Sequence, residues 1–211
     1  TWDDKALDKY VEIVRWMANH KMTPMVTLHH FTDPLWLVDQ GGWESEETPA
    51  LFARYVRRVV TALKEYVSLW ITVNEPNVFI MGGWVDGGFP PGRSDLKLAA
   101  RVTVNVLRGH AAAYRVLHEL QPEAQVGVAT NYRSLVPAHA WSPFDKLPAR
   151  IQDQLFNRAF NDALATGKLN LVLKKMNLPE VAGTQDFIGL NYYSRNMVAF
   201  DITKAGEMFG R

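Results

Sequence analysis

The sequence predicts an α/β fold in which a parallel sheet is covered by helices. Short, almost continuously apolar segments alternate with longer segments whose apolar residues recur every three or four positions. Buried parallel strands have the first pattern, and helices that cover a sheet have the second. A polar side chain follows each apolar segment, as expected where strands end in the functional loops of a (β/α)8 barrel.

The two patterns predict where the helices and the strands lie. Helices are expected at residues 4–19, 48–66, 95–120 and 149–165, and strands at 25–28, 69–73, 125–129 and 187–190. Asp3 and Asp4 are cap candidates for the first helix. Thr48 followed by Pro49 predicts an N-cap with proline at the first position of the second helix.

The polar residues at the strand ends separate a barrel from an open sheet. Four successive strands end at His30, Glu75, Asn131 and Asn191, and barrel enzymes build their sites at these carboxyl ends. The Gly-rich loop after Glu75 lacks the G-x-G-x-x-G spacing of a doubly wound sheet, which stays the minority alternative. Eight such units would need roughly 420 residues. The 211 residues therefore supply about half a barrel.

Composition excludes several classes of partner. Lys and Arg number 23 against 22 Asp and Glu, a net charge of +1, and no run of five like charges occurs. Nucleic acid and anionic membranes are therefore not expected partners. No apolar stretch approaches the length of a spanning helix. The absence of cysteine excludes disulfides and thiolate metal sites and leaves the compartment open.

Glu75 is the main candidate for chemistry, although a strand-end glutamate can also be a metal ligand or a surface residue. A metal site is disfavoured because the adjacent His29 and His30 on an extended segment point to opposite faces. Taken alone, His30 could equally be a loop or core histidine, and Tyr193 a packing residue. Neutral hydrogen-bonding groups at the other strand ends suit the recognition of hydroxyl groups.

Several blocks resemble glycoside hydrolase family 1, in that family's order and over nearly the whole chain. They are V-T-L-H-H-F-T-D-P-L-W-L at 26–37, G-G-W at 41–43, W-I-T-V-N-E-P-N at 70–77, F-P-P-G at 89–92, G-H-A-A-A-Y-R-V-L-H at 109–118 and D-F-I-G-L-N-Y-Y-S at 186–194. Phe31 departs from the pattern, since a Trp is commoner there. The resemblance implies a (β/α)8 catalytic domain of which residues 1–211 form strands three to six, without the first two and last two strands.

The resemblance also implies a role for each candidate residue. Glu75 would be the general acid/base of a retaining β-glycosidase, protonated before the glycosidic bond breaks. His30 and Asn74 match positions that bind sugar hydroxyls, and Tyr193 would orient the nucleophile. Asn191 matches a position near the departing group, and Asn131 lies on the aglycone side.

The resemblance further implies that this segment needs the rest of a barrel. The family's nucleophile is a second glutamate on the seventh strand, in a block absent here, so the segment alone should be nearly or wholly inactive. The expected substrate is a β-glucoside or related β-glycoside, including 6-phospho forms, with no cofactor or metal and a cytoplasmic location. The alternative is a non-catalytic half barrel that binds sugar, or that covers its open edges with another copy or the missing segments.

Overall fold

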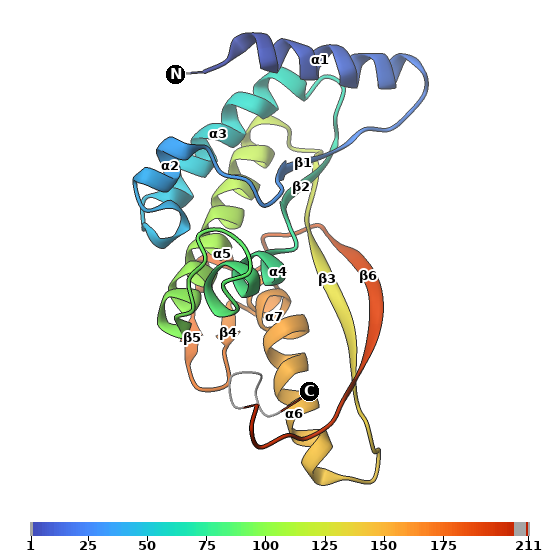
Figure 1. Cartoon of the computed structure of the whole chain (residues 1–211). Coiled ribbons are helices and arrows are strands. Elements are labelled where there is room, and N and C mark those ends of the chain that lie inside the picture. Colours follow the sequence, from blue (N-terminus) through green and yellow to red (C-terminus); the bar gives the residue numbers. More distant parts are fainter. Residues whose placement is uncertain (1, 205–209, 211) are drawn as a thin grey trace. The chain divides into compact units, whose positions relative to one another are not determined.

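The computed structural model describes residues 2–204 and 210, which form two compact units (Figure 1). The first unit holds the described residues up to Asn74 together with Arg101–Ala129 and Thr184–Gly189. The second holds Glu75–Ala100, Thr130–Gly183 and the described residues from Leu190 onward. The chain therefore crosses between the units five times, after Asn74, Ala100, Ala129, Gly183 and Gly189.

The first unit contains a sheet whose strands follow the order β1-β2-β3-β6. Its members are β1 (Met25–His29), β2 (Leu69–Asn74) and the first residues of β3 (Gln125–Pro137) and β6 (Phe187–Val198). Strands β1 and β2 pair in parallel from Met25↔Leu69, and β2 and β3 from Leu69↔Gln125. The predicted α/β class with a parallel sheet is confirmed.

The first unit contains three amphipathic helices. They are α1 (Asp4–Asn19), α3 (Thr48–Leu63) and the part of α5 (Leu96–Leu120) that begins at Arg101. Asp3 caps α1, since its side chain accepts from the Ala6 amide. The core is built around the fully buried Trp43 and Trp70. Gly109 lets α5 approach closely, because a Cβ there would lie 2.8 Å from the Trp43 ring.

Shorter elements complete both units. The first also contains α2 (Leu35–Asp39) and the 3-10 turn η1 (Gly42–Glu44). The second contains α4 (Pro76–Ile80), α6 (Pro143–Asp153), α7 (Ala159–Thr166), the π-helical turns η2 (Met81–Val85) and η3 (Gln154–Arg158), and the 3-10 turn η4 (Pro179–Val181). It also contains the antiparallel pair β4 (Lys168–Asn170) and β5 (Lys175–Asn177).

Three sequence-based expectations are wrong in detail. Thr48 is the first residue of α3 rather than its N-cap, and its hydroxyl donates to the Gly42 carbonyl. The helix expected at 149–165 begins at Pro143, where Ser142 caps the Asp145 amide. Strands β3 and β6 continue well beyond Ala129 and Leu190, and the two are hydrogen-bonded neighbours. Directly after β3, the Ala138 amide donates to the Val198 carbonyl.

Those longer strands change where two candidate residues lie. Asn131 and Asn191 are inside β3 and β6 rather than at their ends. They are nevertheless close to the point where each strand leaves the first unit, at Ala129 and Gly189. In the part of the chain that the structure describes, no helix combines the length and apolar character required to cross a bilayer.

Candidate functional site

Glu75 directly follows β2 and has a left-handed backbone, with φ 46° and ψ 57°. This conformation is uncommon for a residue with a side chain and is maintained only where surrounding contacts impose it. Here Glu75 occupies the N-cap position of α4, Pro76 follows at the start of that helix, and the Glu75 carbonyl accepts from the Phe79 amide at 2.9 Å. The sharp turn between strand and helix thus falls on the candidate acid itself.

The Glu75 side chain is buried and is bound by two asparagine amides. Only 7% of Glu75 is exposed. Its Oε1 accepts from the Asn131 Nδ2 at 3.1 Å and from the Asn191 Nδ2 at 2.9 Å. An oxygen that accepts two N–H groups is poorly placed to carry a proton, so a protonated Glu75 would bear its proton on Oε2.

In the first unit, Asn74 contacts His30. The Asn74 Nδ2 lies 3.2 Å from the His30 Nε2, so the amide donates when that nitrogen is unprotonated. A bulge in β2 gives Asn74 this direction: Ile71 pairs with Gly127 and Asn74 with Ala129, three residues of β2 against two of β3. The extra residue reverses the alternation of side chains along the strand. Thr72 therefore faces α5, while Asn74 faces His30.

Thr72 takes part in a buried hydrogen-bond chain through His110 of α5. The His110 Nε2 lies 2.6 Å from the Thr184 carbonyl and its Nδ1 lies 2.6 Å from the Thr72 hydroxyl. A carbonyl only accepts, so Nε2 carries the proton and the Thr72 hydroxyl donates to Nδ1. Burial lowers the pKa of His110 to about 4, because charging the imidazole away from water is unfavourable. The ring is therefore neutral near neutral pH.

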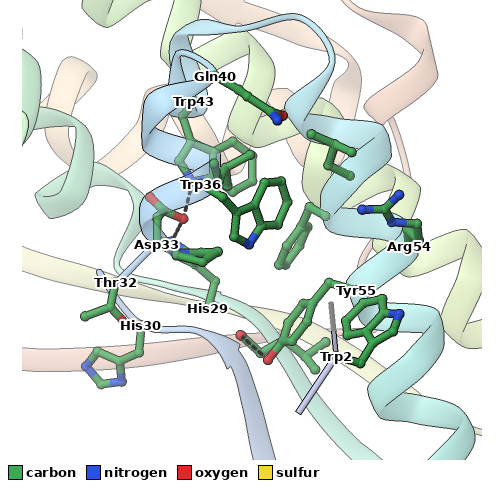
Figure 2. A pocket seen from close by; sticks show the side chains of 15 residues that line it. Trp2, His29, His30, Thr32, Asp33, Trp36, Gln40, Trp43, Arg54 and Tyr55 are labelled. Carbon is green, nitrogen blue, oxygen red and sulfur yellow. Dashed lines mark hydrogen bonds and ion pairs between the residues drawn. The ribbon is translucent and has the colours of Figure 1, made fainter. Parts of the chain in front are cut away.

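His29 and His30 point to opposite sides of β1, as expected of adjacent residues on a strand. His29 is buried against Trp43 and Phe52, with its Nε2 3.2 Å from Asp33 Oδ1. Figure 2 shows the His29 ring directed toward Asp33 and Trp43, while the His30 ring points away from them. His29 belongs to the lining of an aromatic cavity of about 1110 Å³ in the first unit, to which Trp2, Trp36 and Tyr55 also contribute.

The structure thus groups the sequence-predicted residues in two sets. His30 and Asn74 lie together in the first unit, and Glu75, Asn131 and Asn191 lie together in the second. Tyr193, in the second unit, is 74% exposed, and within the described part of that unit it forms no hydrogen bond to Glu75, Asn131 or Asn191. Among residues 2–204 and 210, no three His, Asp or Glu side chains are grouped closely enough to hold a metal ion.

Sequence reasoning missed two buried asparagines in the second unit. The Asn77 Nδ2 donates to the carbonyls of Asn131 and Phe156, and the Asn157 side chain bonds to the backbone of Arg133. Asn77 appeared only as the last letter of the W-I-T-V-N-E-P-N block. No periodicity marks an amide that bonds to a distant backbone, so neither residue stands out from its neighbours in sequence.

Comparison with known proteins gives consistent matches. The family model "Glycosyl hydrolase family 1" matches residues 2–209. The curated protein "Beta-glucosidase A" from Thermotoga maritima is 33% identical over 94% of this chain and 47% of its own length. Among solved structures, a β-glycosidase from Pyrococcus horikoshii matches with a TM-score of 0.90 and 34% identity, covering 100% of this chain and 48% of that one.

A second solved structure shows a bound ligand. The β-glucosidase from Thermotoga maritima in complex with glucoimidazole matches with a TM-score of 0.91 and 32% identity, covering 97% of this chain and 49% of that one. The chain therefore spans about half the length of the proteins it matches, in sequence and in structure alike.

Proposed function

Because the chain belongs to glycosyl hydrolase family 1, we propose that Glu75 is the general acid/base of a retaining β-glycosidase. The observation that carries this proposal is the buried Glu75 carboxyl with two neutral amide donors on Oε1. The acid protonates the glycosidic oxygen as the bond breaks and later takes a proton from the attacking water. Oε2 is the oxygen that gives and receives that proton.

The neighbouring polar residues take the roles of substrate ligands. His30 and Asn74 bind hydroxyls of the sugar whose bond is cleaved, and their mutual contact favours one shared orientation. Asn131 and Asn191 orient the carboxyl and lie toward the departing group. Tyr193 orients the nucleophile. The proposed substrate is a β-glucoside, which the glucoimidazole bound by the related Thermotoga maritima enzyme supports.

The complete activity belongs to a complete barrel. A retaining mechanism needs a second carboxylate about 5 to 5.5 Å from the first. That nucleophile is proposed to lie on a barrel strand outside these 211 residues, so the segment by itself is inactive. The reaction is proposed to need no cofactor or metal, and the proposed location is the cytoplasm.

The test uses the chain inserted in place of the matching segment of Thermotoga maritima β-glucosidase A, beside the chain alone. We expect the chimera to hydrolyse 4-nitrophenyl β-glucoside. Glu75→Gln should reduce turnover by about 10²- to 10⁴-fold, the usual contribution of a general acid. A 2,4-dinitrophenyl glucoside should suffer a smaller loss of kcat/KM, which reports bond cleavage, because its leaving group needs little protonation. The matched control is Glu123→Gln, at an exposed glutamate.

The outcomes separate the possible functions. Equal losses of kcat/KM on both substrates, or a Glu75→Gln chimera as active as its parent, would remove Glu75 from the acid/base role. Binding of glucose-like ligands by a folded chimera without any turnover would favour the non-catalytic, sugar-binding alternative. Circular dichroism of each variant shows whether a loss of turnover is accompanied by a loss of fold.

A further inference from the structure

Strand β3 is bound along one edge by two asparagine side chains at the segment that carries Asn131. The Asn77 Nδ2 donates to the Asn131 carbonyl at 2.7 Å and to the Phe156 carbonyl at 2.9 Å. Asn77, Asn131 and Asn157 are each at most 8% exposed. Hydrogen bonds in such a setting are costly to lose, because the groups left behind cannot turn to water.

Asn157 binds the same strand two residues further along. Its Nδ2 donates to the Arg133 carbonyl at 2.8 Å, and its Oδ1 accepts from the Arg133 amide at 3.1 Å. This exchange of two bonds imitates the pairing of a neighbouring strand. Because residues two apart present their backbone groups to the same edge of a strand, Asn77 and Asn157 together hold residues 131–133.

The π-helical turn η3 makes this arrangement possible. Its wider hydrogen-bond spacing covers Gln154–Arg158, which contains both the Phe156 carbonyl that accepts from Asn77 and the Asn157 side chain. Single π-helical turns inside helices occur frequently at functional sites. Asn77 itself lies two residues after Glu75, in α4. The segment from Glu75 to Asn77 thus contains both the candidate acid and the residue that bonds to Asn131, the hydrogen-bond partner of that acid.

From these contacts we infer that Asn77 and Asn157 are positioning residues, which fix Asn131 so that its amide is directed at the Glu75 Oε1. The chain of bonds runs from the Asn77 amide to the Asn131 carbonyl, and from the Asn131 side chain to the carboxylate. Asn191 donates to the same oxygen from β6. Among the described residues, neither Asn77 nor Asn157 bonds to Asn191 or to that oxygen. The catalytic meaning of this inference rests on the proposed function, whereas the positioning itself does not.

The experiment follows the side-chain amides of Asn131 and Asn191 by ¹⁵N NMR in the 211-residue chain at constant pH, with Glu75 present and with Glu75→Gln. The response of each amide is the change in its signal when the carboxylate is replaced by a neutral amide. In the otherwise unchanged chain both amides should respond together, because both donate to the Glu75 Oε1. In Asn77→Leu, and in the milder Asn77→Ser that keeps one donor, the Asn131 response should be lost or reduced. The Asn191 response should remain. Asn157→Ala should act in the same direction.

Asn105→Leu is the matched control. Asn105 is also a buried asparagine, and its Nδ2 bridges the carbonyls of Trp43 and Ser45 at 2.9 and 3.1 Å, in the first unit. Asn105→Leu should lower the stability of the chain by a similar amount and leave the responses of the Asn131 and Asn191 amides unchanged.

Two results would overturn the inference: an unchanged Asn131 response in folded Asn77 variants, or an equal loss at Asn131 and Asn191, which a general loosening of the fold would give. Failure of the proposed function is recognised separately, by an active Glu75→Gln chimera. In that case selective loss at Asn131 would still establish the positioning contact. If Asn77→Leu does not fold, Asn77→Ser and Asn157→Ala decide between the outcomes.

Discussion

At the scale of single residues, Glu75 combines an unfavourable backbone with an unusually specific side-chain environment. A left-handed conformation costs an L-residue with a Cβ about 1 to 2 kcal/mol. The contacts that offset this cost are the start of α4 and the two amides on Oε1. Strain of this kind is frequent in residues that must present a reactive group in one direction.

The strain at Glu75 can be measured with two substitutions that both remove the carboxyl. Glu75→Gly should be more stable than Glu75→Ala by about 1 kcal/mol, since glycine adopts positive φ without steric cost. The measurement is urea unfolding of the 211-residue chain. The two variants are compared with the same slope of unfolding free energy against urea concentration. An alanine variant as stable as the glycine variant would show that the turn relaxes once its carboxyl is gone.

At the scale of elements, the bulge in β2 allows one strand to bond to α5 through Thr72 and to His30 through Asn74. Thr72 on one side of the strand donates to His110, and two residues later Asn74 contacts His30. Without the extra residue, Thr72 and Asn74 would share a face. The hydroxyl bond to α5 thus helps to hold the irregularity that directs Asn74.

Thr72→Val tests the energetic part of this connection. The two side chains have similar shapes, but valine leaves the His110 Nδ1 without its donor, which should cost about 1 to 3 kcal/mol of stability. Thr72→Ser keeps the hydroxyl and is the control for the loss of a methyl group. Chemical denaturation of both variants gives the comparison, and a serine variant less stable than the valine variant would contradict the assigned bond.

Element boundaries show how far local sequence information reaches. The helix α1 was predicted with the bounds observed, Asp4–Asn19, because its cap and its periodicity lie within the segment itself. The second halves of β3 and β6 were missed, since these two neighbouring strands, Gln125–Pro137 and Phe187–Val198, are far apart in sequence. The start of α6 was also missed, although Ser142 and Pro143 form an ordinary cap and first-turn pair.

The sequence likewise predicted some residues of the candidate site and missed others. Strand ends pointed to Glu75, Asn131 and Asn191, and the structure brings these three together. The structure also brings together His30 and Asn74, which the family resemblance assigns to sugar hydroxyls, although their mutual contact was not predicted. The bonds of Asn77 and Asn157 were not predictable, because they depend on where a π-helical turn places carbonyls of another element. The roles of all these residues, and of the exposed Tyr193, stay predictions.

At the scale of the whole molecule, buried titratable groups make folding depend on pH. The pKa of His110 is about 4 in the folded chain and 6.5 without burial. The unfolded chain therefore binds more protons than the folded chain between these values, so stability is lost as the pH falls through this window. The pKa of Asp145 is lowered by the Phe200 amide and by His139. Its contribution is lost only below its ordinary value of 3.8.

The two windows allow His110 to be tested alone. Between about pH 7.5 and about pH 4.5 the wild type should lose about 2.5 kcal/mol of unfolding free energy through His110. His110→Gln keeps a hydrogen-bond donor and an acceptor but does not titrate. Its unfolding free energy should therefore change little between about pH 7.5 and about pH 4.5, and should still fall at lower pH. Urea unfolding at several pH values gives both curves, and parallel curves would assign the acid sensitivity to other groups.

The amides around Glu75 also bear on how this protein ages. Asparagine slowly deamidates through attack by the next residue's backbone nitrogen, and a bulky next residue hinders that attack. Asn131 and Asn191 are each followed by a tyrosine, at 132 and 192. Deamidation of either would replace a donor on Oε1 by a second carboxylate beside Glu75. The two tyrosines thus protect the chemical integrity of the carboxyl's surroundings over long storage.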